Sequence, residues 1–363
     1  MKLLKKLTAL FLVCLMALSL TACHKKDEIA VTINGYEFTS AYYMCAFVNA
    51  YLQGQQEVMI ELSEEEAQEE IDYTKHKIGD KKFEDWVKDT AIETLKKNAY
   101  FMGLCDEKKI KMTDDYKETN EYYAELYWSS YGYSEIFEPN GVSLNTFKKY
   151  MVDEYYAELY FEKAYGAKGE NEVPAKDIKS KLYKDFAIAN ILDYSHASDA
   201  TDAELAKNIK KFKEYAADIK AGKVTFEEVY NEFNDIKETE EETEEDHEDH
   251  DHAEPKDALA TVIGADGTGY DHDFYKDIKK LKTGEIKVFE KEDKAGCLLV
   301  IKQDIKADDF YLEDLDMQIR HLLKDDEFNK KGEEESKKLT AEINKFAVNQ
   351  FKVKKIVEPT YNY

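Results

Sequence analysis

The sequence predicts an α+β fold in which a mostly helical domain is interrupted by a compact module of strands and helices. Three observations support this prediction. Apolar residues recur at helical spacing over 83–105. Residues 186–305 read as strand, helix, helix, turn and strand, in that order. Two further segments with helical apolar spacing follow, over 312–323 and 339–347, so helices flank the module on both sides in the chain.

Composition excludes several classes of function. The chain has 363 residues and a formal net charge of −26, so it repels nucleic acid and anionic lipid head groups. Arg320 is its one arginine, which disfavours bidentate phosphate recognition. Aromatic residues make up 13% of the chain, far more than disordered chains contain, so most of it should fold. We expect no nucleic-acid partner and no cofactor.

The N-terminus is typical of an export signal. Three lysines precede an apolar run from Leu7 to Leu20, which is too short for a lasting membrane span. The run ends in Leu20-Thr21-Ala22-Cys23, which resembles a bacterial lipobox. The resemblance implies that residues 1–22 are a lipoprotein signal peptide, that Cys23 is diacylated, and that 23–27 are a linker. Two acyl chains give stable anchoring to the outer face of the cell membrane. An ordinary signal peptide with an incidental cysteine is the alternative.

The other mature cysteines, Cys45, Cys105 and Cys297, lie in apolar patterns without metal-binding spacing. We expect buried free thiols, with a Cys45–Cys105 disulfide as the alternative.

The first part of the chain, 28–183, predicts a hairpin followed by helices. Residues 29–33 alternate like a strand, and Asn34-Gly35 is a hairpin turn before the return strand at 36–38. The next helix is expected over Ser40–Leu52, with Ser40 as its cap, and a loop or exposed helix is expected over 63–82. Further helices are expected over 83–105, after a cap at Thr113 or Asp114, over 144–164, and over 175–183 after Pro174. Tyrosines crowd 121–133 and 150–160; most should be core, and a minority could line a cleft for extended peptide segments.

The sequence motifs of residues 186–305 resemble those of the parvulin-type peptidyl-prolyl isomerase module. The strand from Phe186 to Leu192 stands where the family has "HILV", and the strand Cys297–Lys302 stands where it has "G-Y-H-I-I-K". Between them, Phe274, Leu281 and Gly284-Glu285-Ile286 match "F-x-x-A-x-F-x-L-x-x-G-E-I" in register. In that family, the phenylalanine and leucine positions help to hold a proline in an apolar cup.

The opening "V-T-I-N-G-x-x-F-T" resembles extracytoplasmic foldases of the PrsA and SurA type. The resemblance implies that 28–183 and 306–358 form one discontinuous helical chaperone domain, with the parvulin-like module 186–305 inserted. It also implies that unfolded or secreted proteins are the partners. The sequence does not decide between a monomer and a homodimer.

The family's active-site residues are substituted here. Asn190 stands for the first histidine and Leu299 for the last, while Asp235 falls near a third family position. Lys279 replaces an aromatic residue of the cup and should bring a charge near the proline. We therefore expect a client-binding foldase with weak or no isomerase activity, in which Asn190 ties its strand to a neighbouring loop. An active isomerase is the alternative.

An acidic, histidine-rich insert occupies 236–255 and contains His247, His250 and His252. We expect a disordered, solvated loop. The alternative is a weak zinc or calcium site, which would make the protein a metal-binding surface lipoprotein.

Overall fold

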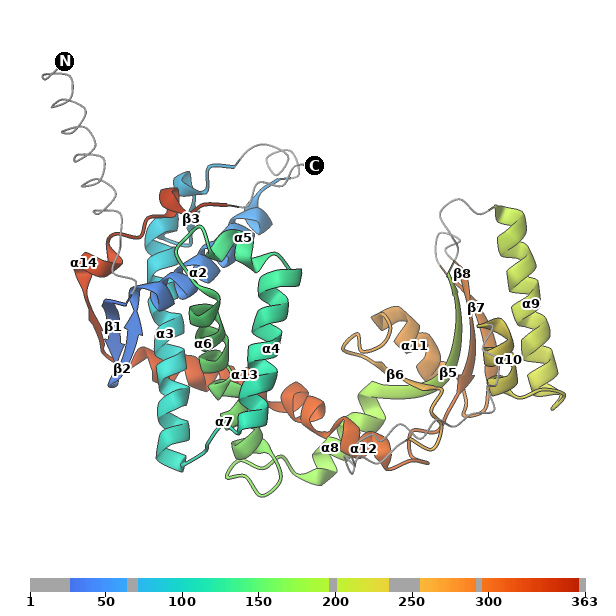
Figure 1. The fold of residues 1–363 in the computed structure, drawn as a ribbon. Coiled ribbons are helices and arrows are strands. Elements are labelled where there is room, and N and C mark those ends of the chain that lie inside the picture. The colour runs from blue at the N-terminus through green and yellow to red at the C-terminus, as the bar shows by residue number, and fades with distance from the viewer. Residues whose placement is uncertain (1–26, 64–70, 196–200, 235–254, 292–295, 359–363) are drawn as a thin grey trace, which may run out of the picture. The chain divides into compact units, whose positions relative to one another are not determined.

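The computed structural model describes residues 27–63, 71–195, 201–234, 255–291 and 296–358 (Figure 1). The chain divides into two compact units, unit 1 with Met1–Asn171 and Lys324–Tyr363, and unit 2 with Glu172–Leu323. The α+β class is confirmed, and unit 1 is built from two separate stretches of chain. The signal 1–22, Cys23, Asp235 and the three insert histidines lie outside the described residues.

Unit 2 is longer at both ends than the expected 186–305. It also contains helices α8 (Ala175–Asp185) and α12 (Phe310–Asp314) and the first turns of α13 (Asp316–Lys337), which continues into unit 1. Arg320 explains the later boundary. Its buried guanidinium binds Asp316 one turn earlier, and its Nη1 donates to the Val173 carbonyl at 3.2 Å. The start of α13 is thereby tied to the residues just before α8.

A three-stranded antiparallel sheet joins the two stretches of unit 1. β1 (Ile29–Ile33) lies between β2 (Tyr36–Thr39) and β9 (Ala341–Ile343). The predicted turn is confirmed, because Asn34 and Gly35 both have positive φ, 51° and 85°. The prediction of one helix across 339–347 was wrong. Asn344 interrupts it, because its side chain accepts from the N–H groups of Phe346 and Ala347 and caps the short helix α14 (Lys345–Val348).

Helices α2 (Ser40–Glu61) and α3 (Phe83–Lys108) carry most of the core of unit 1. The cap of α2 is Thr39 rather than Ser40, since the Thr39 hydroxyl accepts from the Tyr42 N–H at 3.2 Å. The helix also runs past Leu52. Gly54 is required there, because a Cβ atom at this position would lie 2.9 Å from the Phe83 ring.

The remaining helices of unit 1 are α4 (Asp114–Ser130), α5 (Tyr133–Phe137), α6 (Leu144–Glu154) and α7 (Tyr156–Tyr165). Thr113 is confirmed as the cap of α4, since its hydroxyl accepts from the Tyr116 N–H. The single long helix expected to Ala164 is divided at Tyr155, whose N–H bonds back to the Val152 carbonyl in a tighter turn. Short elements complete the unit: η2 (Tyr73–Lys75), β3 (Lys77–Ile78), β4 (Lys81–Lys82) and η4 (Val353–Lys355).

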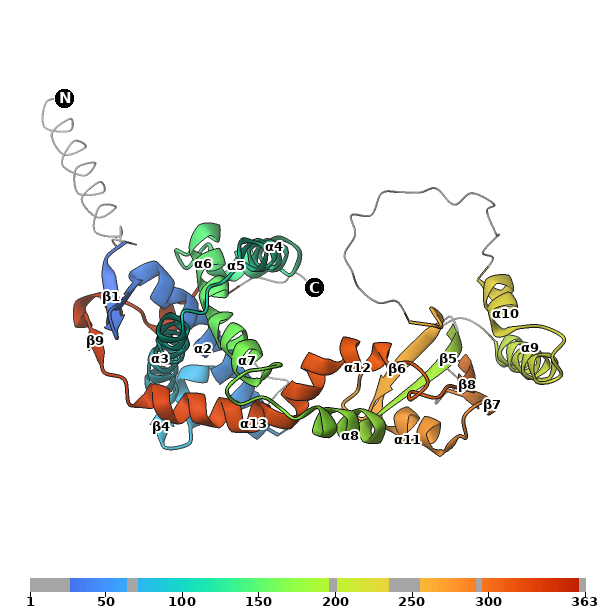
Figure 2. The ribbon, with the colours of Figure 1, turned by 90° about the horizontal axis from the view of Figure 1, so that it is seen from below.

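Unit 2 is built on a four-stranded antiparallel sheet in the order β6-β5-β8-β7, formed by β5 (Phe186–Ser195), β6 (Ala260–Gly264), β7 (Ile286–Glu290) and β8 (Gly296–Lys302). α9 (Asp202–Lys220) and α10 (Phe226–Phe233) cover one face, and α11 (His272–Lys280) covers the other (Figures 1 and 2). Each face has its own apolar cluster, because strand side chains alternate between faces.

None of the helices within the described ranges is both long enough and apolar enough to pass through a bilayer.

Candidate functional site

Asn190 and Leu299 lie on the same face of the unit 2 sheet, the face covered by α9 and α10. Leu299 is fully buried in that apolar cluster and pairs with Leu192. Asn190 is 3% exposed, and its amide donates to Asp257 Oδ2 at 2.8 Å. It also accepts a hydrogen bond from Gln303. The predicted tie between Asn190 and a neighbouring loop is therefore confirmed.

The two residues expected to hold a proline lie on the opposite face. Phe274 packs between Tyr270 and Phe289, with ring centroids 4.7 and 5.5 Å away, and Leu281 packs against the same cluster. That cluster includes Ala189 and other β5 residues that alternate with Asn190. Asn190 and Leu299, which stand at the family's histidine positions, therefore lie on the other face of the sheet from Phe274.

Lys279 does not bring its charge to Phe274, in contrast to the expectation. Its ammonium donates to the Tyr183 and Phe186 carbonyls, each at 2.9 Å, and so joins α11 to the start of β5. Burial lowers the pKa of Lys279; the charge of Asp185 opposes this shift and that of Lys306 adds to it. The third predicted position, Asp235, lies outside the described residues.

Cys45, Cys105 and Cys297 are buried free thiols, as expected, and the alternative Cys45–Cys105 disulfide is not formed. Within the part of the chain that the structure describes, no group of three or more histidine, cysteine or acidic residues is arranged to hold a metal ion.

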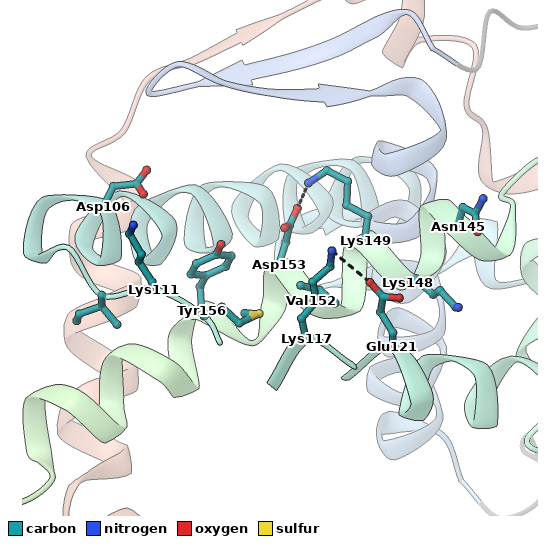
Figure 3. A pocket seen from close by; sticks show the side chains of 12 residues that line it. Asp106, Lys111, Lys117, Glu121, Asn145, Lys148, Lys149, Val152, Asp153 and Tyr156 are labelled. Atoms are coloured by element: carbon teal, nitrogen blue, oxygen red, sulfur yellow. Dashed lines mark hydrogen bonds and ion pairs between the residues drawn. The ribbon is translucent and has the colours of Figure 1, made fainter. Parts of the chain in front are cut away.

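Unit 1 has an open hollow of about 730 Å³, called here the α4 hollow (Figure 3). Its walls come from the end of α3, from α4, α6 and α7, and from the loop before α4; they are Asp106, Ile110, Lys111, Met112, Lys117, Glu121, Asn145, Lys148, Lys149, Val152, Asp153 and Tyr156. Four lysines and three carboxylates therefore surround an apolar strip. Such a surface can contact both apolar side chains and charges of either sign.

Ion pairs fix several of these walls. Lys149 pairs with Asp153 one turn along α6, and Figure 3 shows this pair pointing into the hollow. Lys148 reaches across to Glu125 on α4. Burial raises the pKa of Asp153, while Lys149 lowers it. The next residue, Glu154, has its pKa raised to about 7 by burial.

Next to the α4 hollow, α4 exposes aromatic side chains. Tyr122 and Tyr123 are 62% and 48% exposed, and Tyr131, which follows the helix, is 66% exposed. Ala124 is the one fully buried residue among the 17 of α4. A second hollow of about 340 Å³ adjoins Tyr131 and is lined by Leu52, Gln55, Gly132, Tyr133, Ile136 and Glu358. We call Tyr122, Tyr123 and Tyr131 the α4 aromatic surface.

Sequence reasoning identified the tyrosines as cleft candidates but missed the lysines of the α4 hollow. One signal was available, since Lys149 and Asp153 have the i, i+4 spacing of a helical ion pair. The spacing alone did not indicate a site, because such pairs are common on solvated helix faces.

Comparisons with known proteins give no match to any family model and none to a curated protein. Among solved structures, the chain is similar to a crystal structure of the foldase protein PrsA from Lactococcus lactis, at 12% identity and a TM-score of 0.40, covering 88% of this chain and 96% of that chain. It is also similar to PrsA from Bacillus subtilis, at 16% identity and a TM-score of 0.31, covering 69% and 82%. Both likenesses are too distant to assign an activity, so the side chains of this chain must indicate its function.

Proposed function

We propose that this protein is a membrane-anchored extracytoplasmic foldase of the chaperone type, which binds unfolded segments of secreted proteins. The observation that carries the proposal is the α4 aromatic surface beside the α4 hollow. A helix that exposes tyrosine rings while burying one alanine completely has a surface available to a partner.

The chemistry of this surface suits extended, varied segments. A tyrosine ring offers apolar area with few rotatable bonds, and its hydroxyl can bond to a peptide backbone. The lysines and carboxylates of the α4 hollow can accompany client charges of either sign. Because the hollow is open and three of its four lysines are already in ion pairs, we expect modest affinity and little sequence specificity.

Unit 2 is proposed to have weak or no prolyl isomerase activity. Asn190 is already bonded to Asp257 and Gln303, and Leu299 can offer no hydrogen bond. Phe274 packs between two other aromatic rings. Anchoring through diacylated Cys23 is part of the proposal and rests on the lipobox-like sequence.

An aggregation assay tests the client-binding proposal. The soluble protein that begins after Cys23 should slow the aggregation of a chemically unfolded secreted protein. The double change Tyr122→Ser and Tyr123→Ser should weaken this protection several-fold, because it removes exposed aromatic area without touching the core. Phe346→Ser is the matched control, since Phe346 is 75% exposed on α14.

Equal protection by the wild-type protein and the double variant would contradict the proposed site. A short X–Pro peptide assay on the same preparation tests the second part, where turnover comparable to an intact parvulin would contradict the proposed lack of activity.

A further inference from the structure

Lysine side chains gather at one end of the unit 2 sheet, around the start of β5. Lys302 is the last residue of β8 and is only 9% exposed. It pairs with Ala189, whose side chain belongs to the cluster under α11. Because paired residues of an antiparallel sheet point to the same face, the Lys302 side chain lies on the α11 side of the sheet. It approaches Lys279 there, and the charge of Lys279 acts on its titration.

The Lys279 ammonium is held in place by two hydrogen bonds and can still donate a third. Two of its three N–H groups are used by the Tyr183 and Phe186 carbonyls, at 2.9 Å each. A third lysine, Lys306, has its ammonium 5.1 Å from the centre of the Tyr183 ring. Three cationic side chains therefore approach the junction of α8 and β5 from α11, from β8 and from the segment after β8.

Nearby carboxylates offset these charges only in part. Asp185 forms an ion pair with Lys181 at 2.7 Å, and Asp304 accepts from the backbone N–H of Lys306 at 3.0 Å. Within the described ranges, the Lys302 ammonium has no hydrogen-bond or ion-pair partner. The Lys302 ammonium is not among the fully buried polar atoms of the described residues that lack a partner, so solvent, and hence a small anion, can reach it. Burial, and then the charge of Lys279, lowers the pKa of Lys302 to about 8.

We propose that Lys302 and Lys279 form a binding site for a small oxyanion. An oxyanion can accept hydrogen bonds from Lys302 and from the remaining N–H of Lys279 at the same time, because it presents at least two oxygens. Its negative charge would offset the repulsion between the two ammonium groups. This site is separate from the α4 hollow and from the Asn190 network, which lies on the other face of the sheet.

The site predicts its own pH dependence. Binding requires a protonated Lys302, so affinity should fall as the pH rises through the titration of this lysine. The charged groups that act on Lys302 and Lys279 are Lys306, Asp304 and Asp185, with Lys181 paired to Asp185.

Isothermal titration calorimetry on the protein that begins after Cys23 tests the proposal, with sodium sulfate as the probe because sulfate does not titrate above pH 7. Sodium chloride at matched ionic strength is the blank, and sodium acetate is a second arm that distinguishes a tetrahedral oxyanion from a carboxylate. We expect saturable heat from one of the two probes at pH 7 and at least a tenfold weaker response at pH 10.

Lys302→Met should reduce the affinity at pH 7 at least tenfold. Lys276→Met, which removes an exposed lysine from the same helix α11, should not. Should Lys302→Met fail to fold, the proposal is tested by Lys279→Met, which should also weaken binding at pH 7, and by the pH series on the wild-type protein. Absence of saturable heat from both probes would overturn the proposal, as would equal binding by Lys302→Met and Lys276→Met or equal binding at pH 7 and pH 10.

Discussion

Replacing Asn190 by alanine should destabilise unit 2 by about 2–4 kcal/mol. A buried hydrogen bond to a charged group contributes about 1.5–3 kcal/mol, and one between neutral amides about 1 kcal/mol. Asn190 makes one of each kind, to Asp257 and with Gln303. Because Asn190 itself is almost fully buried, water cannot take over its role. Asp257 is only half-buried and regains some water, so the lower half of the range is expected.

A double-mutant cycle with Asp257→Ala isolates the interaction energy between Asn190 and Asp257, and we expect a coupling energy of about 1–2 kcal/mol. Asn234→Ala is the matched control. This asparagine is exposed at the end of α10, where its amide donates to the Tyr230 carbonyl. The Asn234→Ala change should lower the free energy of unfolding by no more than about 0.5 kcal/mol.

Hydrogen exchange of the β5 and β6 amides, followed by mass spectrometry, is the appropriate assay. Both tryptophans, Trp86 and Trp128, belong to unit 1, so their fluorescence reports that unit instead. It serves as the control for an intact unit 1. If Asn190→Ala loses no more protection in β5 and β6 than Asn234→Ala does, the reasoning about the buried amide is refuted.

Three further predictions concern other parts of the chain. Burial raises the pKa of Glu154 from 4.5 to about 7, so the folded state binds this proton more tightly and unit 1 loses stability as the pH rises from 4.5 to 7. Glu154→Gln should therefore raise the urea midpoint of tryptophan fluorescence at pH 8 but not at pH 4.5; an equal effect at both would refute this. Cys23→Ala should release the protein from membranes, and an unmodified Cys23 in the membrane fraction would disprove acylation. An equally long Gly/Ser linker in place of 237–254 should leave the melting temperature within a few degrees, since this segment has almost no apolar side chains, and a large drop would contradict it.

Local patterns predicted much of the fold. The Asn34-Gly35 turn, the Thr113 cap and the strands that became β5 and β8 each depend on a few neighbouring residues, and the structure contains all of them. The three-residue strand β9 could not be predicted in the same way. It exists because it pairs with β1, more than 300 residues earlier in the chain, and this pairing leaves no local period.

The candidate site was harder to predict because strand side chains alternate. The resemblance aligned Asn190 and Leu299 correctly with each other, and they do share a face. It did not fix which face Phe274 would cover, since that depends on the side of the sheet to which α11 returns. The position of Lys279 likewise follows from tertiary packing, because its partners are backbone carbonyls with no sequence signature.

Site-specific photo-crosslinking tests the client-binding proposal most directly. A photoreactive phenylalanine analogue would be placed at Tyr122 in one protein and at Phe346 in another, because both positions are exposed and neither change disturbs the core. Each protein would be mixed with the same unfolded secreted protein, and crosslinked client would be quantified. The account predicts several-fold more crosslinking from position 122 than from position 346, and competition by unlabelled unfolded client but not by its folded form. Equal crosslinking from the two positions would contradict it.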